Sequence, residues 1–492
     1  MSIRRNSSYN LIGSAIPLIL SLVTVPVYLH LIGAERYGVL AIAWLLLGYF
    51  GLFDLGLGRA TSFRIAALRD AAPQERSDIF WAALVANVAM GCAGGAILWI
   101  ASGYFFSHLF KVADAIRPEI IESIPWLALS VPVATLTGVL TGALQGREKF
   151  LQVNLISTAS TIFFQLAPLS VAIFFGPRLF YLLASALLVR AIALLWLMRA
   201  CHQVITRGSR PKLIFSEIST LLRYGGWVTI ASLFGPILYM IDRLTIGVML
   251  NAVAVTIYTI PLQLAQRIAI VPSALTTALF PRLSASSEEH QRILGATATR
   301  VLCSIMTSPI IVAIFLIQPF LAVWVGTDLA IKAAPIGRIL FVGFWANSLA
   351  LVPFNQLQAR GRPDLVTKIL IAEIPPYIAG LYFGLREFGL LGCAIVQALR
   401  YIVDLLLLAF VANRKEAGWH LMALNFPFLV LAVLCAGRWN APHWLWFVTG
   451  IGLTGVTALL GWKTFPAELR GTVVQRLQDR FVKIRLRSST QI

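Results

Sequence analysis

The chain has 492 residues, of which 58% are hydrophobic and only 12% are charged, and its mean hydropathy is +0.81. A soluble protein of this length needs more charge to cover its surface, so the composition excludes a soluble enzyme and predicts an integral membrane protein. The net charge of +19 does not indicate a nucleic-acid partner. Membrane proteins concentrate Lys and Arg in their cytoplasmic connections and in segments that contact anionic lipid.

Apolar stretches long enough to cross a bilayer follow one another along the whole chain. We therefore expect an all-α polytopic membrane protein with about fourteen transmembrane helices, at 9–31, 38–58, 79–101, 123–144, 151–175, 179–198, 224–248, 254–281, 301–324, 333–357, 366–384, 389–411, 421–437 and 444–462. The eighth span is long enough to tilt or kink. No cleavable signal peptide is evident before the first span.

The orientation follows from the basic residues of alternate connections. One side, including the tail after Trp462, carries 28 of the 40 Lys and Arg residues, and the other side carries 7. By the positive-inside rule the first side is cytoplasmic, which places both termini in the cytoplasm. Within the tail, residues 468–487 have apolar residues on one helical face and basic residues on the other, which is typical of a helix lying on anionic lipid. A solvated tail is the alternative.

The short connections argue against an enzyme. They contain no phosphate-binding G-x-x-x-x-G-K-[ST] motif and no G-x-S-x-G motif, and the longest outer connection is about twenty residues. The five cysteines and six histidines are scattered without metal-ligand spacing, so we predict no metal and no cofactor.

The chain reads as two similar halves. "YNLIGSAIPLILSLVTVPVYLHLIG" begins at Tyr9 and "YGGWVTIASLFGPILYMIDRLTIG" at Tyr224, and six spans separate the two starts. Parallel repeats of this kind place a binding cavity between two lobes. We therefore divide the chain into four parts: an N-lobe with spans 1–6 (1–200), a C-lobe with spans 7–12 (213–412), spans 13–14 (420–462) and the basic cytoplasmic tail (463–492).

Several stretches carry a resemblance to a known family, the oligosaccharidyl-lipid and polysaccharide flippases, which share a superfamily with the multidrug/toxin exporters and the peptidoglycan-precursor flippases. The matching stretches are "LIGAERYGVLAIAW" (31–44), "FDLGLGRA" (53–60), "LTGALQGREKF" (140–150), "YGGWVTIASLFGPILYMIDRLTIG" (224–247) and "YTIPLQLAQRIAIVPSALTTALFPRLS" (258–284). The resemblance implies two six-helix lobes around a central cavity, with two further helices at the C-terminus. It also implies movement of polyprenyl-diphosphate-linked sugar units across the bacterial inner membrane, as in O-antigen or exopolysaccharide biosynthesis.

Such a substrate gives charged residues inside the spans a role. A diphosphate-sugar head cannot cross lipid unaided, and arginine grips phosphate oxygens bidentately. We expect Arg59, Arg267, Gln263 and Asp54 to line the substrate cavity. Thr256 shares a helical face with Gln263 and Arg267, and two prolines flank Arg267 and predict a kink. Alternatively, Arg267 is tied to carbonyl groups of a neighbouring helix, and Arg59 is only a positive-inside residue. For Asp54 we consider two roles: it holds an arginine in place while the site is empty, or it carries a coupling proton.

The remaining in-span charges have two interpretations each. Asp242 and Arg243 form either an outer gate or an interfacial pair that stabilises a helix end. Glu373 and Asp404 are candidates for coupling to a proton or sodium ion, although Asp404 and Arg400, spaced i,i+4, also fit a structural ion pair. Arg190 and Arg338 are the other basic residues inside predicted spans.

The predicted function is a flippase that works by alternating access, with polyprenyl-linked saccharide, anionic lipids and a coupling ion as its partners. A multidrug/toxin exporter is the alternative, although it would favour acidic groups for a cationic drug. An integral-membrane sugar polymerase or ligase is a third hypothesis, against which the short outer connections argue.

Overall fold

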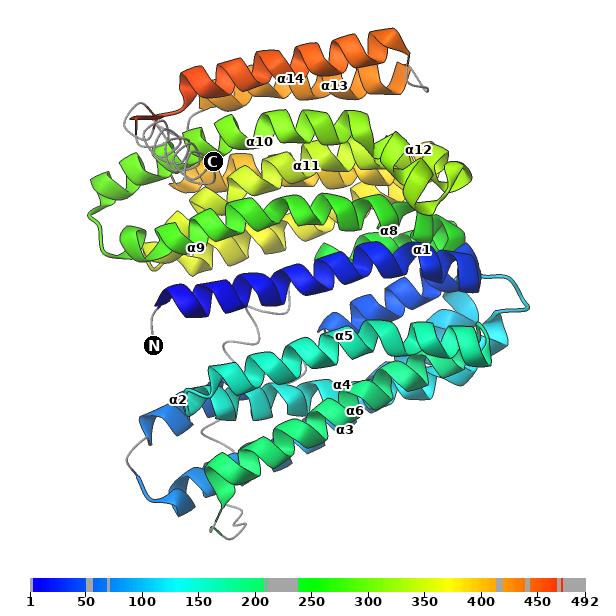
Figure 1. Cartoon of the computed structure of the whole chain (residues 1–492), viewed down its shortest axis with the longest axis vertical. Helices are drawn as coiled ribbons and strands as arrows, with labels where there is room; N and C mark the ends of the chain where they lie inside the picture. The colour runs from blue at the N-terminus through cyan, green and yellow to red at the C-terminus, as the bar shows by residue number, and fades with distance from the viewer. Residues whose placement is uncertain are drawn as a thin grey trace, which may run out of the picture. The chain divides into compact units, whose positions relative to one another are not determined.

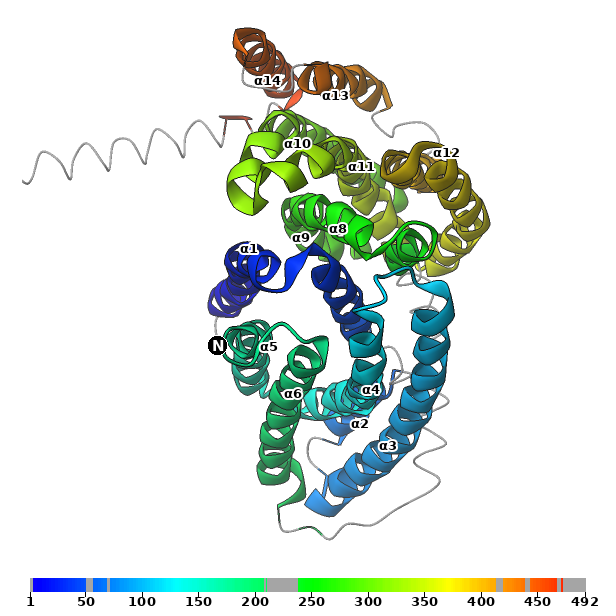
Figure 2. The same cartoon turned by 90° about the vertical axis from the view of Figure 1, so that its right-hand side faces the viewer.

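The computed structural model describes residues 3–49, 56–68, 71–207, 209, 238–412, 419–438, 443–466 and 470–471. Within these ranges every regular element is a helix (Figures 1 and 2). The predicted residue Asp54, most of the predicted seventh span and most of the basic tail lie outside the described residues. The chain divides into two compact units, Met1–Thr259 and Ile260–Ile492.

The first unit is built from six long or medium helices and two short π-helical turns. These are α1 (Ile3–Tyr49), α2 (Leu57–Ala67), α3 (Pro73–Tyr104), η2 (Phe105–Leu109), α4 (Arg117–Gly146), α5 (Phe150–Phe175), α6 (Leu179–Cys201) and η3 (His202–Thr206), followed by helical residues 238–249 and the start of α8 (Ala252–Gln266). Helix α4 lies at the centre, because α2, α3 and α6 all pack against it, while α5 packs between α6 and α1 (Figure 2).

The second unit takes the rest of the chain. It contains the end of α8, η4 (Arg267–Ala269), α9 (Ile270–Ser284), α10 (Glu288–Val325), α11 (Thr327–Ala359), α12 (Pro363–Ala412), α13 (Trp419–Arg438) and α14 (Trp444–Thr464). Helix α11 is the most enclosed of these, with α9, α10, α12 and α13 packed around it (Figure 1).

Helix α1 is two spans joined at a sharp turn. Its 47 residues would extend about 70 Å as one rod, more than twice the hydrocarbon thickness of a bilayer. Gly33 has φ 78° and ψ 164°, a conformation that glycine adopts without strain, and it breaks the helix. The rings of Tyr28 and Trp44, which lie on either side of the break, are 5.2 Å apart, whereas a straight helix would separate these residues by about 24 Å. The two halves therefore lie side by side.

Helix α12 repeats this device in the second unit. Gly389 has φ 57° and ψ −140° and breaks a 50-residue helix. The two halves approach so closely that a Cβ atom on Gly392 would lie 1.9 Å from the carbonyl oxygen of Gly384. Among the described residues, eleven helices are long and apolar enough to cross a membrane; α12 holds two of the predicted spans, and α1 holds the first predicted span and the beginning of the second. The expectation of an all-helical polytopic membrane protein is confirmed.

The outer surfaces of both units are apolar, as lipid contact requires. Phe174 on α5, Val323 on α10 and Ile451 on α14 are 78%, 91% and 72% exposed. A water-soluble monomer does not expose apolar surface on this scale, whereas a bilayer removes its cost.

Candidate functional site

An open groove that is lined by both polar and apolar residues lies between α2 and α4 in the first unit. Its volume is about 570 Å³, and we call it the α2–α4 groove. From α2 it is lined by Gly58, Arg59, Ser62, Phe63 and Ala66, and from α4 by Ala134, Thr137, Gly138, Thr141, Gly142 and Gln145. The predicted cavity residue Arg59 therefore lies on the wall of a space large enough for part of a ligand.

Glycines set the geometry of this groove. Gly56, with φ 72°, starts α2 in a left-handed conformation, so the predicted span 38–58 does not run straight into Arg59. Two residues further on the two helices nearly touch, because a Cβ atom on Gly142 would lie 2.0 Å from the carbonyl oxygen of Gly58. Arg59 follows Gly58 directly, in the first turn of α2, where the positive end of the helix dipole adds to its charge.

The environment of Arg59 favours an anionic ligand. Its side chain is exposed, and in the part of the chain that the structure describes it forms no ion pair and no hydrogen bond. A charged arginine within a membrane-embedded bundle is costly unless it faces water, a counter-ion or a ligand. The open α2–α4 groove, with hydroxyl and amide side chains on its walls, supplies such a position.

The other cavity candidates, Gln263 and Arg267, lie in the second unit. Gln263 is half-buried on α8, and Arg267 is exposed and begins the 3₁₀ turn η4. This turn interrupts the helix at the predicted place, because Pro272 cannot donate the backbone hydrogen bond that a continuous helix requires. Thr256 is different: it is buried in the first unit, where its hydroxyl donates to the carbonyl oxygen of Ala34 at 2.5 Å.

The five in-span arginines differ in what surrounds them. Arg267 is the exposed member of this set. Arg338 is buried and donates to Gln318 Oε1 at 2.6 Å, and the guanidinium carbon of Arg190 lies 4.5 Å from the centre of the Phe164 ring. The buried members Arg243 and Arg400 are paired with carboxylates.

Asp242 and Arg243 form a buried pair. Arg243 Nε lies 3.5 Å from Asp242 Oδ1, and one of its terminal nitrogens donates to the carbonyl oxygen of Tyr239 at 2.9 Å. Within the same unit, the ammonium group of Lys111 donates to the Met249 carbonyl oxygen at 2.8 Å and holds the end of this helical segment. These interactions of Asp242 and Arg243 are typical of a contact that stabilises a helix. The role of the pair as an outer gate stays a prediction.

Glu373, Arg400 and Asp404 form a charged cluster between the two halves of α12. Arg400 lies 3.6 Å from Glu373 Oε2, and both side chains are buried. Asp404 lies near enough to both the Glu373 carboxyl group and Arg400 to interact with them electrostatically. The guanidinium also lies over the rings of Tyr377 and Tyr401, at 5.2 and 4.6 Å from their centres. Two carboxyl groups thus share one arginine.

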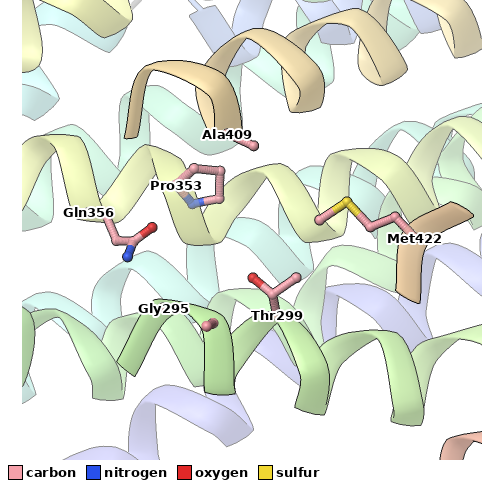
Figure 3. Close-up of a pocket in the computed structure, with 7 residues that line it drawn as sticks. Gly295, Thr299, Pro353, Gln356, Ala409 and Met422 are labelled. Atoms are coloured by element: carbon pink, nitrogen blue, oxygen red, sulfur yellow. The ribbon is translucent and has the colours of Figure 1, made fainter. Parts of the chain in front are cut away.

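The second unit also contains a small enclosed pocket, which Figure 3 shows. Its volume of about 10 Å³ leaves room for at most one water molecule. The Gln356 amide fills the space beside Gly295 and donates to the Gln291 carbonyl oxygen at 2.9 Å. This pocket is a packing feature rather than a binding site. Within the described ranges no group of three His, Cys, Asp or Glu residues is arranged to hold a metal ion.

Sequence reasoning missed the polar wall of the groove. Thr137, Thr141 and Gln145 follow one another at a spacing of four residues along α4. The signal was present in "TGVLTGALQG", where a polar residue precedes a glycine three times at that spacing. Spacing alone did not reveal which helix would pack against the glycines.

The helices and their apolar outer surfaces define a multi-pass membrane protein. The chain belongs to the polysaccharide biosynthesis protein family, whose sequence profile matches residues 3–287, so the resemblance stated from the motifs is confirmed. It is 30% identical over 415 residues to a Shigella flexneri protein named "Putative O-antigen transporter". The aligned region covers 84% of this chain and 98% of the relative.

Two solved structures share the fold. The lipid II flippase MurJ in an inward closed conformation has a TM-score of 0.73 at 12% identity, covering 93% of this chain and 98% of that one. An inward-facing multidrug resistance transporter of the MATE family has a TM-score of 0.65 at 14% identity, covering 88% and 99%. At these identities the likeness concerns the fold alone.

Proposed function

We propose that this protein is a flippase, not an enzyme, and that it moves polyprenyl-diphosphate-linked oligosaccharide units from the cytoplasmic to the outer face of the bacterial inner membrane. The units serve the assembly of a surface polysaccharide such as O-antigen or exopolysaccharide. The observation that carries the proposal is Arg59. This exposed arginine lies on an open groove and has no carboxylate partner among the described residues, in a member of a polysaccharide biosynthesis family.

The proposed mechanism is alternating access. Arg59 in the first unit, together with Gln263 and Arg267 in the second, binds the diphosphate-sugar head through charge-assisted hydrogen bonds. Asp54 is proposed to hold an arginine while the site is empty. The two lobes then rock and release the head on the outer side, while the polyprenyl tail stays in the bilayer. Both termini are proposed to be cytoplasmic, as the distribution of basic residues indicates.

Coupling is proposed at Glu373 and Asp404. When both are ionised, the two carboxylates outnumber Arg400, their shared cation, by one charge. Such an excess inside a membrane is costly, so binding of one monovalent cation, a proton or a sodium ion, would neutralise the cluster. Transport into vesicles under a pH gradient or a sodium gradient distinguishes the two ions, and E373Q should reduce the response to whichever gradient drives transport.

A deletion strain tests the function directly. Polyprenyl-linked saccharides are extracted, and the membrane face on which they accumulate is determined with a membrane-impermeant glycosidase added to spheroplasts. Accumulation of single units on the cytoplasmic face, with loss of surface polysaccharide, is the expected result. Accumulation on the outer face would indicate a polymerase or ligase. No accumulation, with increased sensitivity to cationic drugs, would indicate an exporter.

A further inference from the structure

The wall that α4 contributes to the α2–α4 groove carries two parallel stripes. Gly138, Gly142 and Gly146 form one stripe, and the last two of these pack against backbone atoms of α2. The residue before each glycine, Thr137, Thr141 or Gln145, forms the other stripe, and all three line the groove. The glycines allow α2 to pack closely against α4, and the polar stripe therefore lies at the edge of this helix–helix contact.

The polar side chains differ in whether their hydrogen-bonding groups are already used. The Thr137 hydroxyl donates to the Val133 carbonyl oxygen of its own helix at 2.7 Å. The side chains of Ser62, Thr141 and Gln145 form no hydrogen bond with any residue that the structure describes. Thr141 is partly buried and Gln145 is exposed, so a hydroxyl and an amide face the groove with their donors and acceptors available.

The arrangement of charge defines the chemistry that fits. Arg59 is the one charged side chain among the lining residues, all of which lie in the described ranges. The remaining polar groups are neutral hydroxyls and an amide. A ligand that complements such a surface has an anionic end next to a neutral end rich in hydroxyl groups, and a glycosyl diphosphate has this composition.

The register of the two helices places the three side chains. Because Gly58 packs against Gly142 and Ser62 against Gly146, α2 and α4 run parallel here, and Arg59 lies between the levels of Thr141 and Gln145, which are about 6 Å apart along α4. A sugar attached to a diphosphate bound by Arg59 would therefore have both Thr141 and Gln145 beside it.

We propose that Thr141 and Gln145 form a saccharide subsite, which binds the hydroxyl or acetamido groups of the sugar nearest the diphosphate. This inference rests on the proposed flippase function and adds to it a sugar-recognition role for two residues of α4. A site built to hydrogen-bond a substrate hydroxyl discriminates against ligands that lack it, because its own polar groups are then left unpaired.

The test is binding by the purified full-length protein in lipid nanodiscs. Two probes are compared: a short-chain polyprenyl diphosphate, and the same lipid carrying one N-acetylhexosamine. T141V and Q145L should each weaken binding of the sugar-bearing probe by about 3–10-fold and leave binding of the bare diphosphate unchanged. R59Q should weaken both. T161V is the matched control, because the Thr161 hydroxyl donates to its own helix on α5, outside the groove.

The other outcomes are decisive in different ways. If T141V and Q145L weaken both probes equally, or neither, the saccharide subsite is wrong while the flippase function stands. If the wild-type protein binds neither probe, the subsite and the proposed function are both overturned. The deletion-strain experiment gives an independent measure of the function.

Discussion

Arg59 illustrates how a residue's neighbours decide between two roles. The sequence alone supports two interpretations of Arg59 equally: a residue that binds the substrate, or a residue that only sets the membrane topology. Its position in the α2–α4 groove, with no ion pair or hydrogen bond in the described part of the chain, favours the ligand role. A merely snorkelling arginine needs no polar groove beside it.

We therefore predict that R59Q reduces transport of the lipid-linked unit by about 10–100-fold, because charge-assisted hydrogen bonds contribute about 1.5–3 kcal/mol. R59K should retain part of the activity, since lysine keeps the charge but loses the bidentate geometry. Surface polysaccharide in a complemented deletion strain is the measurement. R207Q, at an exposed arginine outside the groove, is the control. Normal transport by R59Q at normal abundance would mean that Arg59 serves topology only.

The second residue-scale prediction concerns the Glu373–Arg400–Asp404 cluster. We expect E373Q and D404N to leave the protein folded, because either single change leaves Arg400 one carboxylate neighbour. The double variant leaves a buried guanidinium uncompensated, and breaking a buried pair in this way costs about 3–5 kcal/mol. Thermal melting of the purified protein measures the effect. A double variant no less stable than the sum of the single changes would contradict a shared arginine.

At the level of elements, the contact between α2 and α4 depends on glycine. G142A places a Cβ atom 2.0 Å from the Gly58 carbonyl oxygen, and because both groups belong to the backbone, α2 must move. We expect a loss of about 1–3 kcal/mol in stability and a smaller groove. The control is G455A on α14, where a Cβ atom meets nothing within 4 Å. Equal melting temperatures for G142A and G455A would show that α2 can move away from α4 without a loss of stability.

Sequence patterning predicted the elements well and their neighbours poorly. Hydropathy is sufficient to place spans, because a lipid-exposed helix must be apolar over about twenty residues. It cannot indicate which polar side chain is captured by which neighbour. Thr256 shares a helical face with Gln263, yet its hydroxyl bonds to Ala34, beside the turn at Gly33. Similarly, the glycines at 138, 142 and 146 do not reveal their partner until α2 is in place.

At the scale of the whole molecule, the proposed cargo carries negative charge outward. Each elementary charge that crosses a potential of 100 mV contributes about 2.3 kcal/mol. With the receiving side positive, the potential alone favours transport of a diphosphate.

We predict that flipping of a labelled polyprenyl-diphosphate saccharide in proteoliposomes accelerates when a potassium–valinomycin potential makes the receiving side positive. Reversing the potential should slow it. If the flipping rate does not change with the potential but increases with an imposed proton or sodium gradient, the driving force comes from the coupling ion. Liposomes without protein control for leakage.

The breaks at Gly33 and Gly389 have a consequence for biogenesis. Each joins two packed spans through a tight turn rather than a long loop, so little polar chain has to cross the lipid when the pair inserts. A reporter domain inserted at either glycine would add a large polar segment and would separate two packed helices. Both positions are therefore poor places for a topology tag, and a protease added on the side of these turns should find little exposed chain to cut.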